Sequence, residues 1–159
     1  MATQDRYLYE ILRDKTFNSD IYLVHYRPGR LRRPPWGRTP CDCFVILGDR
    51  EIDADTARCL ARELAELNND WVYVYGTQSE MVHDLIDQAS VDIGRQAQVG
   101  DGFPMTGWYS HILDPDEIAD SIPGAQPVTL VVLVNQDEEV LQSLKRRIVA
   151  NMERASEER

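Results

Sequence analysis

Residues 71–94, WVYVYGTQSEMVHDLIDQASVDIG, contain the pattern that decides the fold. The run from Trp71 to Tyr75 is β-branched and aromatic without polar alternation, which predicts a strand covered on both faces. Gly76 ends this run. Thr77 and Glu80 then have the spacing of a capping box, with Thr77 as the N-cap residue, so a helix is predicted to start there.

The helix after this strand is predicted to be amphipathic. Apolar residues recur at helical spacing from Val82 to Ile93, and Gly94 is a typical C-terminal stop. His83 falls on the outward side of this pattern. A strand, a tight turn and a covering helix form half of a parallel βαβ unit.

The same unit repeats along the chain. Strands are predicted at residues 43–47, 105–110 and 128–134, and helices after Asp53, after Asp114 and after Asn135. On the first of these helices, Arg58, Arg62 and Glu63 are expected to face water. Consecutive βα units predict an α/β fold: a compact three-layer Rossmann-like or flavodoxin-like sandwich whose mainly parallel sheet has four or five strands.

The length and composition indicate one such domain with appendages. The chain has 159 residues and is 43% hydrophobic, which suffices for one ordinary core. Residues 41–153 are predicted to form the α/β domain, and residues 154–159 a frayed tail. Residues 1–40 are predicted to hold a helix near residues 4–13, an edge strand at residues 20–26 and a basic, Pro-rich arm.

The compartment is predicted to be the cytoplasm. No run approaches the length of a membrane span, and the first residues lack the shape of a signal peptide, so no membrane partner is expected. The three cysteines, Cys41, Cys43 and Cys59, are too few and too scattered for a disulfide framework.

Charge is unevenly distributed along the chain. The net charge is −10, yet residues 1–40 carry eight basic and four acidic side chains. Residues 27–40, RPGRLRRPPWGRTP, contain no acid, and this arm supplies six candidate binding residues: Arg27, Arg30, Arg32, Arg33, Trp36 and Arg38. One interpretation is an arm that docks on a partner, and the other is a loop laid over the acidic body of the same chain. Nucleic acid is disfavoured because the acidic remainder would repel phosphates.

A second candidate site follows from the predicted sheet. Ligands of open α/β sheets bind beyond the carboxyl ends of the strands. A candidate pocket there is formed by residues that follow the predicted strands: Asp49, Thr77, Ser79, Trp108 and His111. The chain has no glycine-rich nucleotide motif, and carboxylates at the helix starts would compete with a phosphate. No cofactor, no metal and no catalytic residue are predicted from the motifs.

Three segments resemble a known family. DWVYVYG, then HDLIDQASVDIG, then PMTGWYS followed by DPDEIADSI are similar to an uncharacterised bacterial family known only as a domain of unknown function. The resemblance covers roughly residues 42–150 and leaves the arm outside. It implies a small cytosolic α/β protein and carries no known activity.

We therefore expect a non-enzymatic binding or regulatory protein that acts through protein–protein contacts. The basic arm would engage an acidic surface on a protein partner or on a second copy of the chain, as in a homodimer. The alternative is a small enzyme or ligand-binding domain with its site at the carboxyl edge of the sheet.

Overall fold

The computed structural model describes residues 10–14, 19–48, 50–94, 105–110, 115–122 and 126–157. Its strands are β1 (Glu10–Asp14), β2 (Ser19–His25), β3 (Cys41–Leu47), β4 (Asn69–Tyr75), β5 (Met105–Tyr109) and β6 (Val128–Val134). Its helices are α1 (Ala54–Glu66), α2 (Ser79–Asp92), α3 (Pro115–Ala119) and α4 (Glu138–Glu157).

The strands form one sheet in the order β1-β2-β6-β3-β4-β5. β1 pairs antiparallel with β2, and the other five strands are parallel. Every residue of β3 and β6 is buried, as the uninterrupted apolar runs predict for strands covered on both faces. The α/β class predicted from the repeated βα pattern is thus confirmed.

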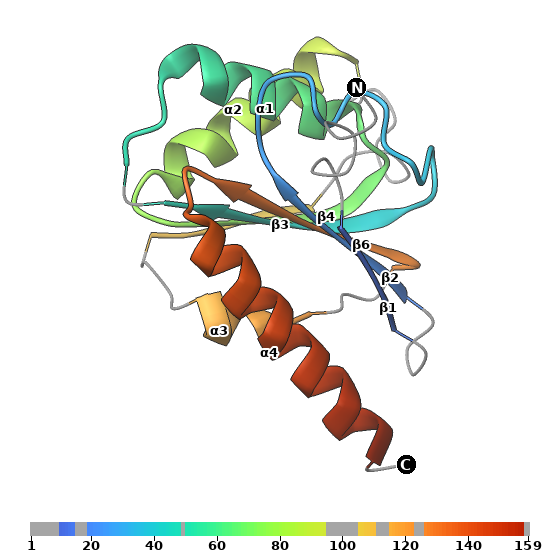
Figure 1. Cartoon of the computed structure of the whole chain (residues 1–159). Helices are drawn as coiled ribbons and strands as arrows, with labels where there is room; N and C mark the ends of the chain where they lie inside the picture. Colours follow the sequence, from blue (N-terminus) through green and yellow to red (C-terminus); the bar gives the residue numbers. More distant parts are fainter. Residues whose placement is uncertain are drawn as a thin grey trace, which may run out of the picture.

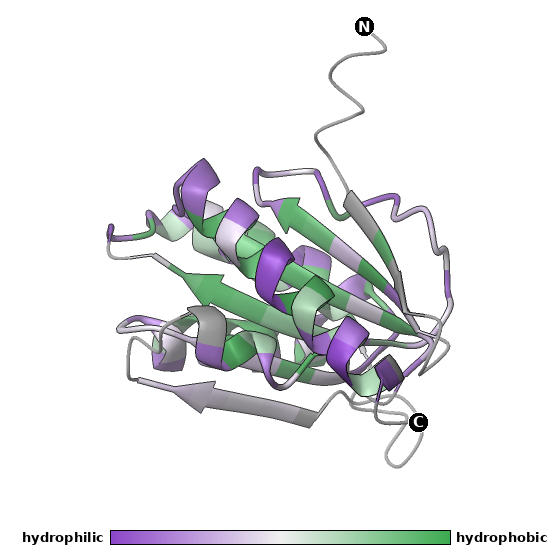
Figure 2. Cartoon of the chain, turned by 60° about the horizontal axis from the view of Figure 1, so that its bottom comes forward, coloured by the Kyte–Doolittle hydropathy of each residue, from purple (hydrophilic) through white to green (hydrophobic). Residues whose placement is uncertain are grey.

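Helices cover both faces of the sheet (Figure 1). On one face α1 and α2 close a core with side chains such as Val45, Val74 and Val132. On the other face α3 and α4 close a second core with side chains such as Phe44 and Val131. Figure 2 shows hydrophobic residues along the central strands, and hydrophilic residues interspersed with hydrophobic ones along the helices.

The crossover connections that run across the sheet toward β5 lie on one face, and the connection that returns from β5 lies on the other face. The segments that advance from β2 to β3, β4 and β5 lie on the α1 and α2 face, whereas the return from β5 to β6 runs through α3 on the opposite face. A single handedness of crossover requires this arrangement. β6 therefore enters between β2 and β3, and the helix that follows it, α4, lies on the opposite face from α1.

The N-terminal elements differ from the prediction. Residues 10–13 of the predicted helix belong to β1, and residues 4–9 lie outside the described part of the chain. The predicted strand at residues 20–26 is present as β2, but it is not an edge strand. β1 pairs with one side of β2 and β6 with the other, so the strand pairing overrides the local helical pattern of residues 10–13.

The helix starts are only partly as predicted. Asp53 caps α1, because its carboxylate accepts a hydrogen bond from the Thr56 N–H at 2.9 Å. The predicted capping box of α2 is wrong, since α2 begins at Ser79 after an N-cap residue, Gln78, that makes no side-chain capping bond. The Gln78 Oε1 atom instead accepts from the Ile52 N–H at 2.8 Å and joins the starts of the two helices. None of the described helices is long and apolar enough to cross a membrane.

Candidate functional site

The arm, residues 27–40, lies on the α1 and α2 face of its own chain (Figure 1). Leu31 and Trp36 are buried in the core of that face, with 1% and 8% of their surfaces exposed. The Trp36 ring centroid lies 4.6 Å from that of Tyr22 on β2. Trp36 was predicted as an apolar anchor, and the structure shows that it anchors the arm to the body of the same chain.

One buried carboxylate holds the arm in place. Glu63 on α1 is 3% exposed, although the helical pattern predicted that it faces water. Its Oε2 atom accepts from the Gly29 N–H at 3.1 Å, and its Oε1 atom accepts from the Leu31 N–H at 3.0 Å. The Tyr26 hydroxyl also donates to Glu63 Oε2. Because the arm forms no strand or helix, this carboxylate replaces the ladder that would satisfy its buried N–H groups.

The start of the arm is also fixed at the end of β2. The Arg30 guanidinium donates to the His25 carbonyl at 2.6 Å. Burial and the hydrogen bond to Glu63 raise the pKa of the Tyr26 hydroxyl well above its ordinary value. The Tyr26 hydroxyl therefore stays protonated and remains a donor over the physiological pH range.

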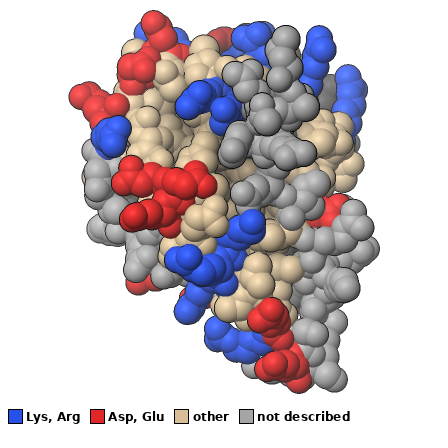
Figure 3. Space-filling view, in the orientation of Figure 1, with Lys and Arg blue, Asp and Glu red and all other residues tan. Residues whose placement is uncertain are grey.

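With its apolar residues buried, the arm turns most of its arginines outward. Arg32, Arg33 and Arg38 are exposed, and they lie beside Arg58 and Arg62, which are exposed on α1. These five residues are called the arginine surface below. They line two neighbouring hollows of about 670 and 480 Å³, which share Arg32 and Glu66. Figure 3 shows Lys and Arg side chains along the upper right edge, where Figure 1 places the arm.

Among the described residues, the close acidic pairs of this surface are those of Arg58 and Arg62. Arg58 lies 3.0 Å from Asp55 and Arg62 lies 2.9 Å from Glu66, both as pairs along α1. The carboxylate of Glu63 is already occupied by the arm backbone and the Tyr26 hydroxyl. The arm arginines therefore add positive charge to a helix face whose own charges are largely balanced.

Of the five residues predicted for a strand-end pocket, the three that the structure describes do not line one described cavity. Asp49 and His111 lie outside the described residues. Thr77 is exposed, whereas the Ser79 side chain is fully buried and does not line a described cavity. Trp108 is 41% exposed on β5, and its ring packs edge-on against His83 at 6.5 Å. His83 itself does not face outward freely, since its Nε2 atom lies 2.9 Å from the Thr106 hydroxyl.

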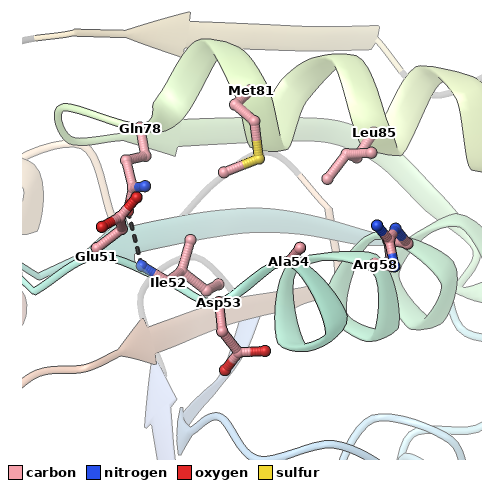
Figure 4. Close-up of a pocket in the computed structure, with 8 residues that line it drawn as sticks. All are labelled: Glu51, Ile52, Asp53, Ala54, Arg58, Gln78, Met81 and Leu85. Carbon is pink, nitrogen blue, oxygen red and sulfur yellow. Dashed lines mark hydrogen bonds between the residues drawn. The ribbon is translucent and has the colours of Figure 1, made fainter.

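A hollow lies beside Gln78, the residue that precedes Ser79, between the starts of α1 and α2. It measures about 490 Å³, and Figure 4 shows Met81 and Leu85 of α2 facing Ala54 and Arg58 of α1. The hydrogen bond from the Ile52 N–H to Gln78 Oε1 lies at one end of this hollow (Figure 4). Its lining mixes apolar side chains with Glu51, Asp53, Arg58 and Gln78, of which Asp53 caps α1, Arg58 pairs with Asp55 and Gln78 accepts from the Ile52 N–H.

The strand order points to a different crevice. In open α/β sheets, ligands bind where neighbouring strands lead to opposite faces. Here β6 leads to α4 on one face, while its neighbours β2 and β3 lead to the arm and to α1 on the other face. The β3 side is closed, because a Cβ atom on Gly48 would come within 2.3 Å of the Asn135 carbonyl oxygen. The β2 side is therefore the open one.

The crevice between β2 and β6 measures about 570 Å³. Its polar lining comes from the end of β2, the first turn of the arm and the start of α4, as follows: His25, Arg27, Arg30, Asn135, Gln136, Glu138 and Gln142. The His25 Nε2 atom lies 3.2 Å from Glu138 Oε2, so the two elements meet across the crevice. Its apolar lining includes Leu23, Leu133 and Leu141, all buried.

Asn135 has an unusual backbone at this point. Its φ of 56° is in the left-handed region, and it is the one described residue other than glycine with a positive φ. Asn135 was predicted to cap the last helix, but α4 begins at Glu138. The left-handed residue instead turns the chain from β6 toward α4, and such geometry recurs at functional sites.

Arg27 and Arg30 were predicted as arm residues, and Asn135 and Gln136 follow the predicted strand at residues 128–134. His25, Glu138 and Gln142 were not predicted as site residues. His25 is not singled out by the sequence, because the three histidines, His25, His83 and His111, are scattered along the chain. The sequence carries no signal that places β2 beside β6, which are more than 100 residues apart in the chain. The crevice therefore exists because the strand order places the end of β2 beside the end of β6.

A six-stranded sheet with helices on both faces and an open strand-end crevice defines an α/β domain of the Rossmann-like or flavodoxin-like type. A family model described as a domain of unknown function (DUF7684) matches residues 21–122, and the chain belongs to that family. The matched region includes the arm, which the resemblance seen in the sequence had left outside, and stops before β6. No curated protein matches the chain.

Proposed function

We propose that the protein is a non-enzymatic binding or regulatory protein whose arginine surface docks on an acidic protein surface. The observation that carries this proposal is the anchoring of the arm by Glu63, Leu31 and Trp36. An arm held in this way displays its arginines on a fixed frame. A partner then binds without ordering the arm, which lowers the entropic cost of association.

The chemistry of the surface favours carboxylates as partners. Guanidinium groups bind carboxylates with paired, charge-assisted hydrogen bonds, and arginine is enriched at interface hot spots. The hollow beside Leu67 and Ile93 adds apolar lining next to Arg33 and Arg38. Charged groups around an apolar centre are the usual arrangement of a protein interface.

A second copy of the chain is one available acidic partner. The whole chain carries a net charge of −10. Acidic side chains lie at the start of α4, where Asp137, Glu138 and Glu139 are exposed, and none of the three lines the hollows of the arginine surface. Complementary charge of this kind accelerates association and makes it salt-dependent.

We also propose that the protein is cytoplasmic. The described cysteines are free thiols, which is the state that a reducing compartment maintains.

The test uses full-length protein and poly-L-glutamate as an acidic probe, measured by titration at low and at high salt. In one variant Arg32, Arg33 and Arg38 are all replaced by serine. The control variant makes the same change in charge elsewhere, by replacing Arg50, Arg146 and Arg154, which are all exposed. We expect the arm variant to bind at least about tenfold more weakly, and the control to bind like the natural protein.

Equal losses in the two variants would show that net charge alone drives the binding, and would overturn the proposal. So would the absence of saturable binding at low salt. Sedimentation velocity on the same three proteins then separates the two kinds of partner. A salt-sensitive dimer that the arm variant fails to form identifies a second copy of the chain, whereas a monomer in all three identifies a different acidic protein.

A further inference from the structure

The crevice between β2 and β6 has features of a small-molecule site that the arginine surface lacks. Its volume of about 570 Å³ lies within the usual range for small ligands. It opens at the point where the strand order sends neighbouring connections to opposite faces. It is also separate from the arginine surface, since none of the five residues of that surface lines it.

Positive and negative groups stand on different elements around the crevice. Arg27 and Arg30 come from the first turn of the arm, while Glu138 comes from the first turn of α4. His25, at the end of β2, lies next to the Glu138 carboxylate at 3.2 Å. The lining therefore offers donors for a carboxylate from one element and an acceptor for a cationic group from another.

A phosphate fits this lining poorly. α4 has Glu138 and Glu139 in its first turn, and these carboxylates complement the positive end of the helix dipole. An anion with two negative charges would be repelled by Glu138 at the same position. A ligand that carries one negative and one positive group avoids this repulsion.

The apolar lining suggests what lies between the charged groups. Leu23, Leu133 and Leu141 contribute to the wall, and each is at most 5% exposed. Because little of these leucines is exposed, they offer a small apolar contact at the base of a mainly polar crevice, enough for a short aliphatic group. Asn135 and Gln142 add amide groups that can donate or accept hydrogen bonds at the rim.

We infer that this crevice binds a small zwitterion, an α-amino acid with an apolar side chain. Arg27, together with Arg30, binds the carboxylate. Glu138 accepts hydrogen bonds from the ammonium group. The ligand side chain lies against the three leucines.

The experiment titrates ¹⁵N-labelled full-length protein with apolar L-amino acids, L-leucine first, and follows the amide shifts by NMR. Two analogues of leucine dissect the recognition: 4-methylpentanoate lacks the ammonium group, and 3-methylbutylamine lacks the carboxylate. We expect leucine to bind with a Kd of about 1 mM or tighter, and each analogue to bind at least about tenfold more weakly. The shifted amides should belong to the ends of β2 and β6 and to the start of α4.

Two variants assign the roles. Arg27→Gln should remove the preference for leucine over 3-methylbutylamine, and Glu138→Gln should remove the preference for leucine over 4-methylpentanoate. Arg146→Gln and Glu153→Gln make matched charge changes at exposed residues outside the crevice lining and should leave the titrations unchanged. Arg30 is left intact because it also fixes the end of β2.

Three results would overturn the inference. The first is the absence of saturable binding by any apolar L-amino acid, and the second is equal binding of leucine and its two analogues. The third is tighter binding of inorganic phosphate than of any amino acid. A failure here leaves the arginine surface unaffected, because the poly-L-glutamate test changes none of the residues of the crevice.

Discussion

Replacing Glu63 with glutamine removes one of the three acceptor contacts that fix the arm. An amide has one acceptor oxygen, and in the orientation that preserves the most contacts this oxygen takes the place of Oε2, which serves the Tyr26 hydroxyl and the Gly29 N–H. The amide nitrogen then faces the Leu31 N–H, which lies 3.0 Å from Oε1 in the natural protein. Two donors therefore face each other in a buried place.

The cost follows from this geometry. A hydrogen bond to a charged group contributes about 1.5–3 kcal/mol, and a buried donor without an acceptor is costly in itself. A neutral amide is less costly to bury than a carboxylate, which offsets part of the loss. We expect the free energy of unfolding to fall by about 2 kcal/mol. Glu66→Gln is the matched control on the same helix, and it should cost no more than about 0.5 kcal/mol because its pair with Arg62 is exposed.

Two measurements check this prediction. Urea unfolding followed by circular dichroism gives the change in global stability. Trypsin digestion of the native protein reports the arm, because Arg30, Arg32 and Arg38 precede residues other than proline. A loss of about 2 kcal/mol in holding the arm corresponds to cleavage about thirtyfold faster. The reasoning is refuted if Glu63→Gln unfolds at the same urea concentration as Glu66→Gln and both are cleaved at the same rate.

Three further substitutions test other contacts. Gly48→Ala would place a Cβ atom 2.3 Å from the Asn135 carbonyl oxygen, so the backbone must shift and the urea midpoint should fall by the equivalent of about 2–3 kcal/mol. The pKa of Tyr26 is raised in the folded protein, so its stabilising contribution is complete below the ordinary tyrosine pKa of about 10 and is lost as the pH rises above that value. Tyr26→Phe should therefore be less stable than the natural protein at pH 8. Between about pH 9 and 11 the urea midpoint of the variant should fall less than that of the natural protein. Trp36→Ala should cost about 3–5 kcal/mol because the ring is buried, whereas Trp108→Ala, at a ring that is 41% exposed, should cost less than about 1 kcal/mol; equal costs would contradict this assignment of core and surface.

The sequence predicts the fold well where the signal is local. The run from Val128 to Val134 is apolar without interruption, and it forms the buried strand β6. The stripe of α1 is likewise apolar at helical spacing, and Leu60 and Leu64 are fully buried as expected. Such patterns report burial directly, because strand and helix periods place side chains on fixed faces.

Glu63 and Thr77 show where local rules fail. A helical pattern assigns every glutamate to water, yet the arm brings buried N–H groups to Glu63 that need an acceptor. An arm with apolar residues and no acid of its own is a signal for such an acceptor elsewhere in the chain. At Thr77 the capping spacing is present, but the preceding glycine has a φ of 128° and the helix starts two residues later.

The crevice could not be predicted because its position depends on the strand order. His25 and Asn135 become neighbours only when β2 pairs with β6, and this pairing spans most of the chain. The five residues predicted for the strand-end pocket lie at or just after the ends of β3, β4 and β5, and none lies at the end of β2 or β6. In the structure β6 inserts between β2 and β3, and the contact between Gly48 and Asn135 closes the β3 side.

The arm occupies the position of a crossover helix between the parallel strands β2 and β3, but it has no internal hydrogen-bond ladder. A helix there would hold its shape by its own continuous backbone ladder, whereas the arm has only isolated turn hydrogen bonds and is held mainly by side chains such as Glu63, Leu31 and Trp36. This segment should therefore open as a separate cooperative unit, at a lower free energy than the sheet beneath it. In native-state hydrogen exchange, the Gly29 and Leu31 amides should exchange together, and well before those of β3 and β6. On this expectation, residues 27–40 detach from the body while the sheet remains folded.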